Sequence, residues 1–153
     1  MNFIYFLYIY TVKRTKKMKI FTSYFGNSRK LKEAGIKIIC VAIGKPRFIA
    51  GIPQMLNVCP TRYMVSGPCS REEYLKLYDR ILASQDANQV VKQIEMLSGG
   101  KDVALCCYEK PGDFCHRHIL AKWITENTGI EITEFGVVEK KEPKYEQANL
   151  FLV

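Results

Sequence analysis

The sequence predicts a single α/β domain in which helices flank a mostly parallel sheet. Its 153 residues, 48% of them hydrophobic, suffice for one ordinary domain core but hardly for two. Patterns typical of strands and of helices alternate along residues 18–138. One strand pattern, Ile36–Ile43, is apolar almost throughout, as expected of a parallel strand covered on both faces. We therefore expect one layered domain at residues 18–138.

The first half of this domain is predicted to hold two strands around a short helix, followed by an irregular segment. The strand at Ile36–Ile43 has the clearest pattern because it is rich in β-branched residues. Six prolines and glycines interrupt residues 45–68, which argues against continuous regular structure there. In order, we expect a strand at Met18–Ser23, a helix from Asn27 or Ser28 to Gly35, the strand at Ile36–Ile43 and the irregular segment.

The second half is predicted to hold three helices and two strands. A capping-box pattern at Ser70–Glu73 opens a helix, in which apolar residues recur at helical spacing up to Leu82. Gly99 and Gly100 are typical of a helix end. The remaining predicted elements are a helix at Ala87–Leu97, a strand at Asp102–Cys107, a helix at Cys115–Asn127 and a strand at Ile130–Val138.

The net charge of +8 is concentrated near the N-terminus. Four basic residues and no acidic one lie in residues 1–17, so residues 18–153 carry only +4. This modest excess favours an anionic partner and leaves direct nucleic-acid binding open. In residues 1–17 an apolar aromatic segment precedes the basic residues, which is the reverse of a secretory signal, and it is too short to span a bilayer.

We expect residues 1–17 to be an extension outside the domain, upstream of a start at Met18; an added edge strand and a weak membrane-surface anchor are the alternatives. We accordingly predict a cytoplasmic protein without a membrane partner. The six cysteines fit the reducing cytosol, where thiols serve as core residues, catalytic groups or metal ligands. Cys40 lies within an apolar run, which favours a place in the core.

The residues richest in chemistry lie between 106 and 118, where a predicted strand leads through a Pro-Gly turn into a helix. The loop at a strand's carboxyl end is where α/β proteins commonly build sites. Cys115 is expected at the helix N-terminus, beside His116 and Arg117, and each of these features favours the thiolate. Cys115 is thus a candidate nucleophile, with Glu109 or His116 as its proton-handling partner. The alternative is a buried cysteine that only packs beneath the loop.

A metal site is the second interpretation of this segment. Its potential ligands are Cys107, Cys115, His116 and His118, with Cys106 as a fifth. Strand alternation directs the two neighbouring cysteines to opposite faces, and the two histidines diverge on a helix, so a four-ligand site is hard to build. The spacing is not a familiar zinc pattern. We therefore predict no resident cofactor or metal, with a structural zinc as a further alternative.

Anion binding is the third interpretation. Free backbone N–H groups at the helix start, together with Arg117 and Lys110, suit a phosphate or carboxylate. Lys45 and Arg47 follow another predicted strand and converge on the same sheet edge if the two strands are neighbours. His118, on the same helix, completes the candidate ligand-binding residues of this region.

The segment Leu105–His118 resembles the signature of domain-of-unknown-function family 488, with Cys107, Glu109, Cys115, His116 and Arg117 at the signature positions. Residues 19–25 also resemble this family, and the whole resemblance extends over about residues 18–132. The resemblance implies a small cytoplasmic α/β domain of unassigned activity, in which the signature residues form an active or ligand-binding pocket.

The chain departs from the family pattern near the first strand. Family members often carry an aspartate-x-arginine there, whereas this chain has Thr22, Ser23 and Tyr24. These three residues are retained as candidate ligand-binding residues, and no acid is available among them for a mechanism that needs one.

Residues 139–153 form a charged tail that ends in a short apolar peptide. Gln147, Leu150 and Phe151 resemble the peptide that docks on the bacterial sliding clamp. We predict an enzyme-like domain whose Cys/Glu/His/Arg pocket takes a small anionic or nucleotide-like ligand. The alternatives are a non-catalytic accessory module of DNA metabolism, recruited to the clamp by this tail, and a tail that folds back onto the domain.

Overall fold

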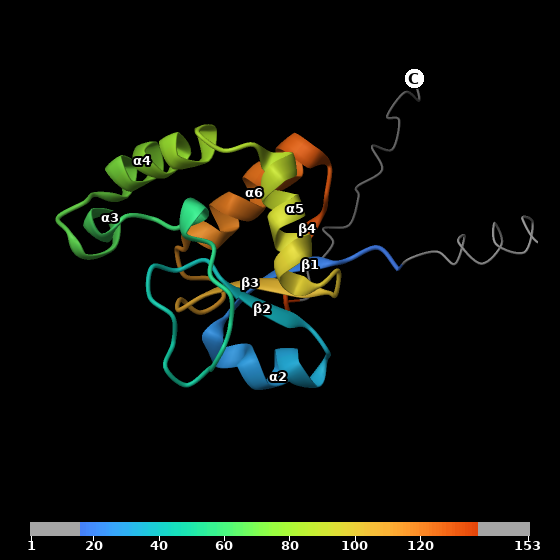
Figure 1. Ribbon diagram of the computed structural model, residues 1–153. Coiled ribbons are helices and arrows are strands. Elements are labelled where there is room, and N and C mark those ends of the chain that lie inside the picture. The colour runs from blue at the N-terminus through green and yellow to red at the C-terminus, as the bar shows by residue number, and fades with distance from the viewer. Residues whose placement is uncertain (1–15, 138–153) are drawn as a thin grey trace, which may run out of the picture.

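In the computed structural model, residues 16–137 are described, and they form an α/β domain around a four-stranded sheet (Figure 1). The spatial order is β2-β3-β1-β4, and every neighbouring pair is parallel. This confirms the predicted fold class. The strands are β1 (Ile20–Tyr24), β2 (Lys37–Cys40), β3 (Val103–Cys107) and β4 (Ile132–Glu134).

Helices cover both faces of the sheet. In Figure 1, α2 lies on one face, whereas α5 and α6 lie on the other, and α4 extends from the end of the domain. The helices are η1 (Phe25–Asn27), α2 (Ser28–Glu33), η2 (Leu56–Val58), α3 (Arg62–Ser66), α4 (Arg71–Ala83), α5 (Ala87–Ser98) and α6 (His116–Thr128), of which η1 and η2 are 3-10 helices. Each face therefore has its own apolar core, and the predicted core residue Cys40 is fully buried in the one beneath α2.

The predicted elements are present with small changes at their ends, and one helix is new. β2 ends at Cys40, three residues before the predicted end. Beyond that point the Val41 N–H group still donates to the Cys106 carbonyl on β3, and the side-chain amide of Gln54 donates to the carbonyls of Ala42 and Ile43. The short helix α3 lies inside the segment expected to be irregular, where Thr61 caps its N-terminus. The last strand is much shorter than predicted: β4 keeps only Ile132–Glu134 of the strand expected at Ile130–Val138, because Phe135 and Gly136 form a turn, with Gly136 at a φ of 78°. Val138 itself lies outside the described residues.

Local capping chemistry explains where the long helices begin and end. The Ser70 hydroxyl accepts a hydrogen bond from the Glu73 backbone at the start of α4. In a complete capping box the Glu73 carboxylate would also accept from the Ser70 backbone N–H group. Here that carboxylate instead accepts a hydrogen bond from the Tyr63 hydroxyl at 2.9 Å. Gly99 ends α5 in the left-handed conformation, with φ of 65°, as its position in the sequence predicts.

The topology determines where a site can form. The chain leaves β1 through η1 and α2 on one face of the sheet, and it leaves β3 through α6 on the other. Open α/β sheets commonly bind ligands outside the carboxyl ends of their strands, and the segments that follow β2 and β3 meet at that edge because these two parallel strands are neighbours. Within residues 16–137, the helices are all too short or too polar to cross a membrane.

Candidate functional site

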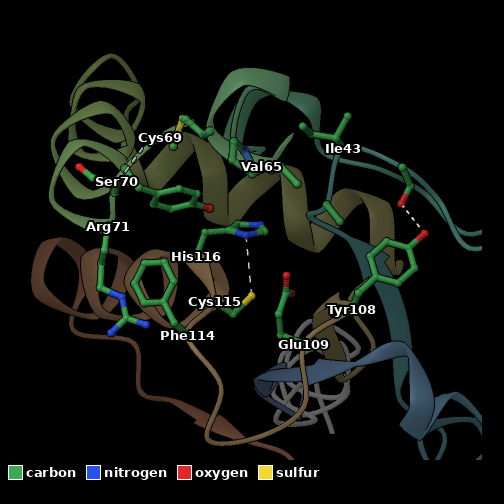
Figure 2. A pocket seen from close by; sticks show the side chains of 15 residues that line it. Ile43, Val65, Cys69, Ser70, Arg71, Tyr108, Glu109, Phe114, Cys115 and His116 are labelled. Carbon is green, nitrogen blue, oxygen red and sulfur yellow. Dashed lines mark hydrogen bonds between the residues drawn. The ribbon is translucent and has the colours of Figure 1, made fainter. Parts of the chain in front are cut away.

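A pocket of about 360 Å³ opens at the carboxyl ends of β2 and β3 (Figure 2). Its walls come from the segment after β2, from α3 and the start of α4, and from the loop between β3 and α6. Tyr74 and Phe114 form an aromatic wall, with ring centroids 5.3 Å apart. The remaining lining residues are Ala42, Ile43, Gly44, Pro60, Met64, Val65, Cys69, Ser70, Arg71, Tyr108, Glu109, Cys115 and His116.

Cys115 and His116 lie at the base of this pocket, at the start of α6. His116 Nε2 lies 2.6 Å from the Val41 carbonyl oxygen, and since a carbonyl only accepts, Nε2 carries the proton. Burial lowers the pKa of His116, so the ring is neutral near pH 7 and Nδ1 keeps a free lone pair. Nδ1 faces Cys115 Sγ at 3.8 Å. The free Nδ1 lone pair is thus directed toward Cys115 Sγ and could accept a proton from that sulfur once it is reduced.

Glu109 extends from the end of β3 into the same space. Figure 2 shows its carboxylate directed toward the region of Cys115 and His116. Burial raises the pKa of Tyr74, and the Glu109 charge raises it further, so the Tyr74 phenol keeps its proton and remains a donor. The Cys115 sulfur, an imidazole, a carboxylate and a phenol therefore face one pocket.

The Sγ atom of Cys107 lies behind Cys115, and the two sulfurs are in bonding contact, as in a disulfide. Their Cα atoms are 7.8 Å apart. The cysteine pattern predicts thiols rather than disulfide staples, so this contact differs from the prediction. Cys106, the adjacent residue on β3, is buried in the core, where burial raises the pKa of its thiol.

Arg117 does not line the pocket, although the sequence analysis placed it there with Cys115. Its guanidinium is fully buried and donates to Cys107 Sγ at 2.9 Å and to the Glu109 carbonyl at 2.8 Å. The remaining donors bind the Glu134 carboxylate on β4, at 2.9 and 3.3 Å. Arg117 therefore reaches the site indirectly, through the sulfur of Cys107 and the backbone of the loop.

Glu134 is the centre of this buried polar cluster. It accepts hydrogen bonds from Arg117, from the Thr22 hydroxyl and from His118 Nε2, the last at 3.1 Å. Burial by itself raises the pKa of Glu134, but these hydrogen bonds outweigh it and bring the pKa down to about 2. The carboxylate is ionised at neutral pH and neutralises the Arg117 guanidinium.

The other candidate ligand-binding residues lie away from the pocket. Thr22 and His118 belong to the Glu134 cluster, and Ser23 accepts from the Asn27 amide at 3.2 Å. Tyr24 pairs with Cys107 in the β1–β3 register. β2 and β3 are neighbouring strands, which is the condition under which Lys45 and Arg47 were expected to converge on the site. The pocket lining nevertheless contains neither of these side chains, nor that of Lys110. The predicted clamp-binding residues Gln147, Leu150 and Phe151 lie outside the described residues.

Helix α4 contributes to the pocket, which the sequence does not predict. Ser70, Arg71 and Tyr74 line it from the start of this helix. Arg71 lies at the rim, with its guanidinium 4.5 Å from the centre of the Phe114 ring. The capping pattern at Ser70 correctly located a helix N-terminus, but no local signal shows that this end faces the loop after β3.

Comparison with protein families supplies the last observation. A family model described as the active DUF488-N3 subclade, DUF488-N3a, matches residues 59–128. Over this segment the chain is similar to the DUF488 family. The match contains all five signature residues and the α4 wall of the pocket, whereas residues 19–25 lie outside it. The resemblance predicted from the signature is thereby confirmed, and searches of curated proteins and of solved structures returned no match.

Proposed function

We propose that this DUF488-type protein is enzyme-like and binds a small anionic, nucleotide-like ligand in the pocket above Cys115 and His116. The observation that carries the proposal is the convergence of two helix N-termini on one pocket that also holds a thiol, an imidazole and a carboxylate. The description of the matched family as an active subclade supports it. Cys69 is a free cysteine that lines the pocket, and with the free Cys40, Cys59 and Cys106 it suits a reducing compartment such as the cytosol.

The anionic part of the ligand is inferred from the helix ends. Ser70 and Arg71 begin α4, and Cys115 and His116 begin α6; all four line the pocket, and each helix has 13 residues. Cys115 provides no side-chain cap to α6, and the His118 N–H group is bonded to the Cys115 carbonyl, so the donors offered at this helix end are the N–H groups of His116 and Arg117. Two helix dipoles and the Arg71 guanidinium together favour a phosphate or carboxylate.

The rest of the ligand is inferred from the walls. The rings of Tyr74, Tyr108 and Phe114 offer surfaces on which a planar group can stack. The Glu109 carboxylate accepts hydrogen bonds from sugar hydroxyls or from ring N–H groups. A volume of about 360 Å³ is near the lower end of ordinary ligand sites, which favours a mononucleotide over a dinucleotide.

The proposal is tested by calorimetric titration of the reduced full chain with adenosine 5′-monophosphate, uridine 5′-monophosphate, adenosine and inorganic phosphate. At least one monophosphate should bind more tightly than adenosine or phosphate alone. Arg71→Gln should weaken that binding by roughly tenfold, because a charged hydrogen-bond donor at the rim is lost. Glu109→Gln should weaken the nucleotide but not inorganic phosphate.

Arg80→Gln is the matched control, since Arg80 lies on the same helix, is exposed and does not line the pocket. It should bind the monophosphates like the unaltered protein. The proposal is wrong if no monophosphate binds at millimolar concentration, or if Arg71→Gln and Arg80→Gln weaken binding equally.

A further inference from the structure

Three soft ligand atoms come together at the base of the pocket. They are Sγ of Cys107, Sγ of Cys115 and a ring nitrogen of His116, and all lie within 4.8 Å of one another. The three residues are buried. They come from two adjoining pieces of structure, the last residue of β3 and the first turn of α6, so the loop between them brings the ligands together.

The surroundings orient these ligands. The Nε2–H group of His116 is bound to the Val41 carbonyl, which directs Nδ1 toward the sulfurs. Arg117 donates to Cys107 Sγ, and Glu134 holds the guanidinium in turn. In metal sites, a histidine ligand commonly donates its other ring N–H to a backbone carbonyl, and hydrogen-bond donors contact the remaining ligands. Such contacts orient the ligand atoms toward the metal.

The backbone separation also fits two ligands of one metal ion. The Cα atoms of Cys107 and Cys115 are 7.8 Å apart, whereas ordinary disulfides join Cα atoms about 4.4 to 6.8 Å apart. A tetrahedral zinc with Zn–S bonds of about 2.3 Å holds two sulfurs roughly 3.8 Å from each other and so tolerates a wider backbone separation.

We propose that reduced Cys107, Cys115 and His116 bind one Zn²⁺, with the fourth coordination position open to the pocket. Binding replaces the two thiol protons, which pass to solvent, and the two thiolates balance the 2+ charge of the ion. Cys115 and His116 line the pocket and Cys107 lies behind them, so the ion faces the ligand space. Three protein ligands and one open position are typical of catalytic rather than structural zinc.

Neighbouring candidates do not complete the ligand set. His118 is directed to Glu134, at 3.1 Å, and Cys106 Sγ is oriented to the Ala104 carbonyl in the core. Glu109 is not part of the three-ligand group, so its carboxylate remains free to act on whatever occupies the fourth position. The zinc site itself does not depend on the proposed function; only the role of its open position does.

The test is the metal content of the full chain, purified under reducing conditions without chelator and then reconstituted with zinc alone. Elemental analysis should give about one equivalent per chain. Cys107→Ser, Cys115→Ser and His116→Ala should each retain less than about a fifth of an equivalent, since metal sites lose affinity steeply when one of three ligands is removed. Cys106→Ala, a buried neighbour on the same strand, should bind zinc like the unaltered chain.

Cobalt substitution supplies a second measurement that does not depend on activity. The reduced chain loaded with Co²⁺ should show thiolate-to-cobalt charge-transfer bands and the d–d bands of a tetrahedral ion, and Cys107→Ser should weaken the charge-transfer bands. Folding of each variant is checked by circular dichroism. Less than about half an equivalent of zinc in the reduced chain, or equal loss in Cys106→Ala and Cys107→Ser, would overturn the proposal.

Failure of this inference is distinguishable from failure of the proposed function. A chain that binds a monophosphate but no zinc contradicts the metal site alone. A chain that binds zinc but none of the nucleotides contradicts the ligand alone and leaves the metal site in place.

Discussion

Arg117 shows how single residues shape this site without facing the pocket. It is fully buried, and its donors reach a sulfur, a backbone carbonyl and both oxygens of Glu134. A buried charge is tolerated only when it is paired and hydrogen-bonded. The arrangement therefore ties the loop after β3 to β4 and holds Cys107 in place.

Glu134→Gln is predicted to destabilise the protein at neutral pH. The pKa of Glu134 is about 2 in the folded protein against an ordinary value of 4.5. A folded pKa below the unfolded one contributes stability that is present above about pH 4.5 and is lost as the pH falls toward 2. Urea denaturation should therefore show a loss on the order of 3 kcal/mol at pH 7 that shrinks by pH 3.

Glu126→Gln is the control for that measurement, because Glu126 pairs with Lys122 on the exposed surface of α6. Its effect should stay within about 0.5 kcal/mol at either pH. If Glu134→Gln lowers the free energy of unfolding equally at pH 3 and pH 7, the lowered pKa of Glu134 is not the cause of its stabilising effect.

At the scale of elements, the pocket depends on how α4 packs against η2 and α6. Tyr78 is buried on this helix and donates from its hydroxyl to the Val58 carbonyl at 2.8 Å, which ties α4 to η2. Its ring also meets the His116 ring edge to face, with centroids 5.5 Å apart. One side chain thus links α4, η2 and α6, the elements that bring Arg71 and Cys115 to the same space.

Tyr78→Phe should cost about 1 to 2 kcal/mol in the free energy of unfolding, because the buried Val58 carbonyl loses its donor while the ring packing is kept. The variant should also weaken nucleotide binding, since α4 is less firmly held. Chemical denaturation and calorimetric titration measure the two effects. Tyr63→Phe, which removes a solvent-exposed hydroxyl bond to Glu73, should change stability by less than about 0.5 kcal/mol.

At the scale of the whole molecule, β3 is the strand on which both layers depend. It pairs with β1 on one side and β2 on the other, and all five of its residues are buried. It also ends directly at Cys107, so the strand that supports the core carries the site at its carboxyl end. Stability of the core and geometry of the site are therefore coupled.

Leu105→Ala is predicted to destabilise the molecule as a whole by about 2 to 5 kcal/mol, because a fully buried side chain in the central strand leaves a cavity. Thermal unfolding should show a single transition at a lower temperature, and hydrogen exchange should lose protection in β1 and β2 together. Leu56→Ala, at a leucine that is 68% exposed, should shift stability by no more than about 0.5 kcal/mol. Loss of protection confined to β3 would contradict the coupling.

Much of the fold follows from local signals in the sequence. The apolar run at β2, the cap at Ser70 and the glycine at the end of α5 each act over a few residues, and each predicted an element end to within about three positions. Helix α3 was missed because its five residues give too short a pattern among prolines and glycines. The clustering of Cys107, Glu109, Cys115 and His116 was predictable because all four lie on one strand, loop and helix start.

The sequence by itself determined the α/β layers and the loop that carries the thiols, because periodicity, capping and turn chemistry are local properties. The tertiary structure alone decided that Arg117 turns away from the pocket to Glu134, and that Arg71 and Tyr74 of α4 complete the pocket wall. The residues in these contacts are separated in the chain by between 17 and more than 40 positions. They depend on strand order and helix packing, which result from burying both faces of the sheet at once and leave no local pattern.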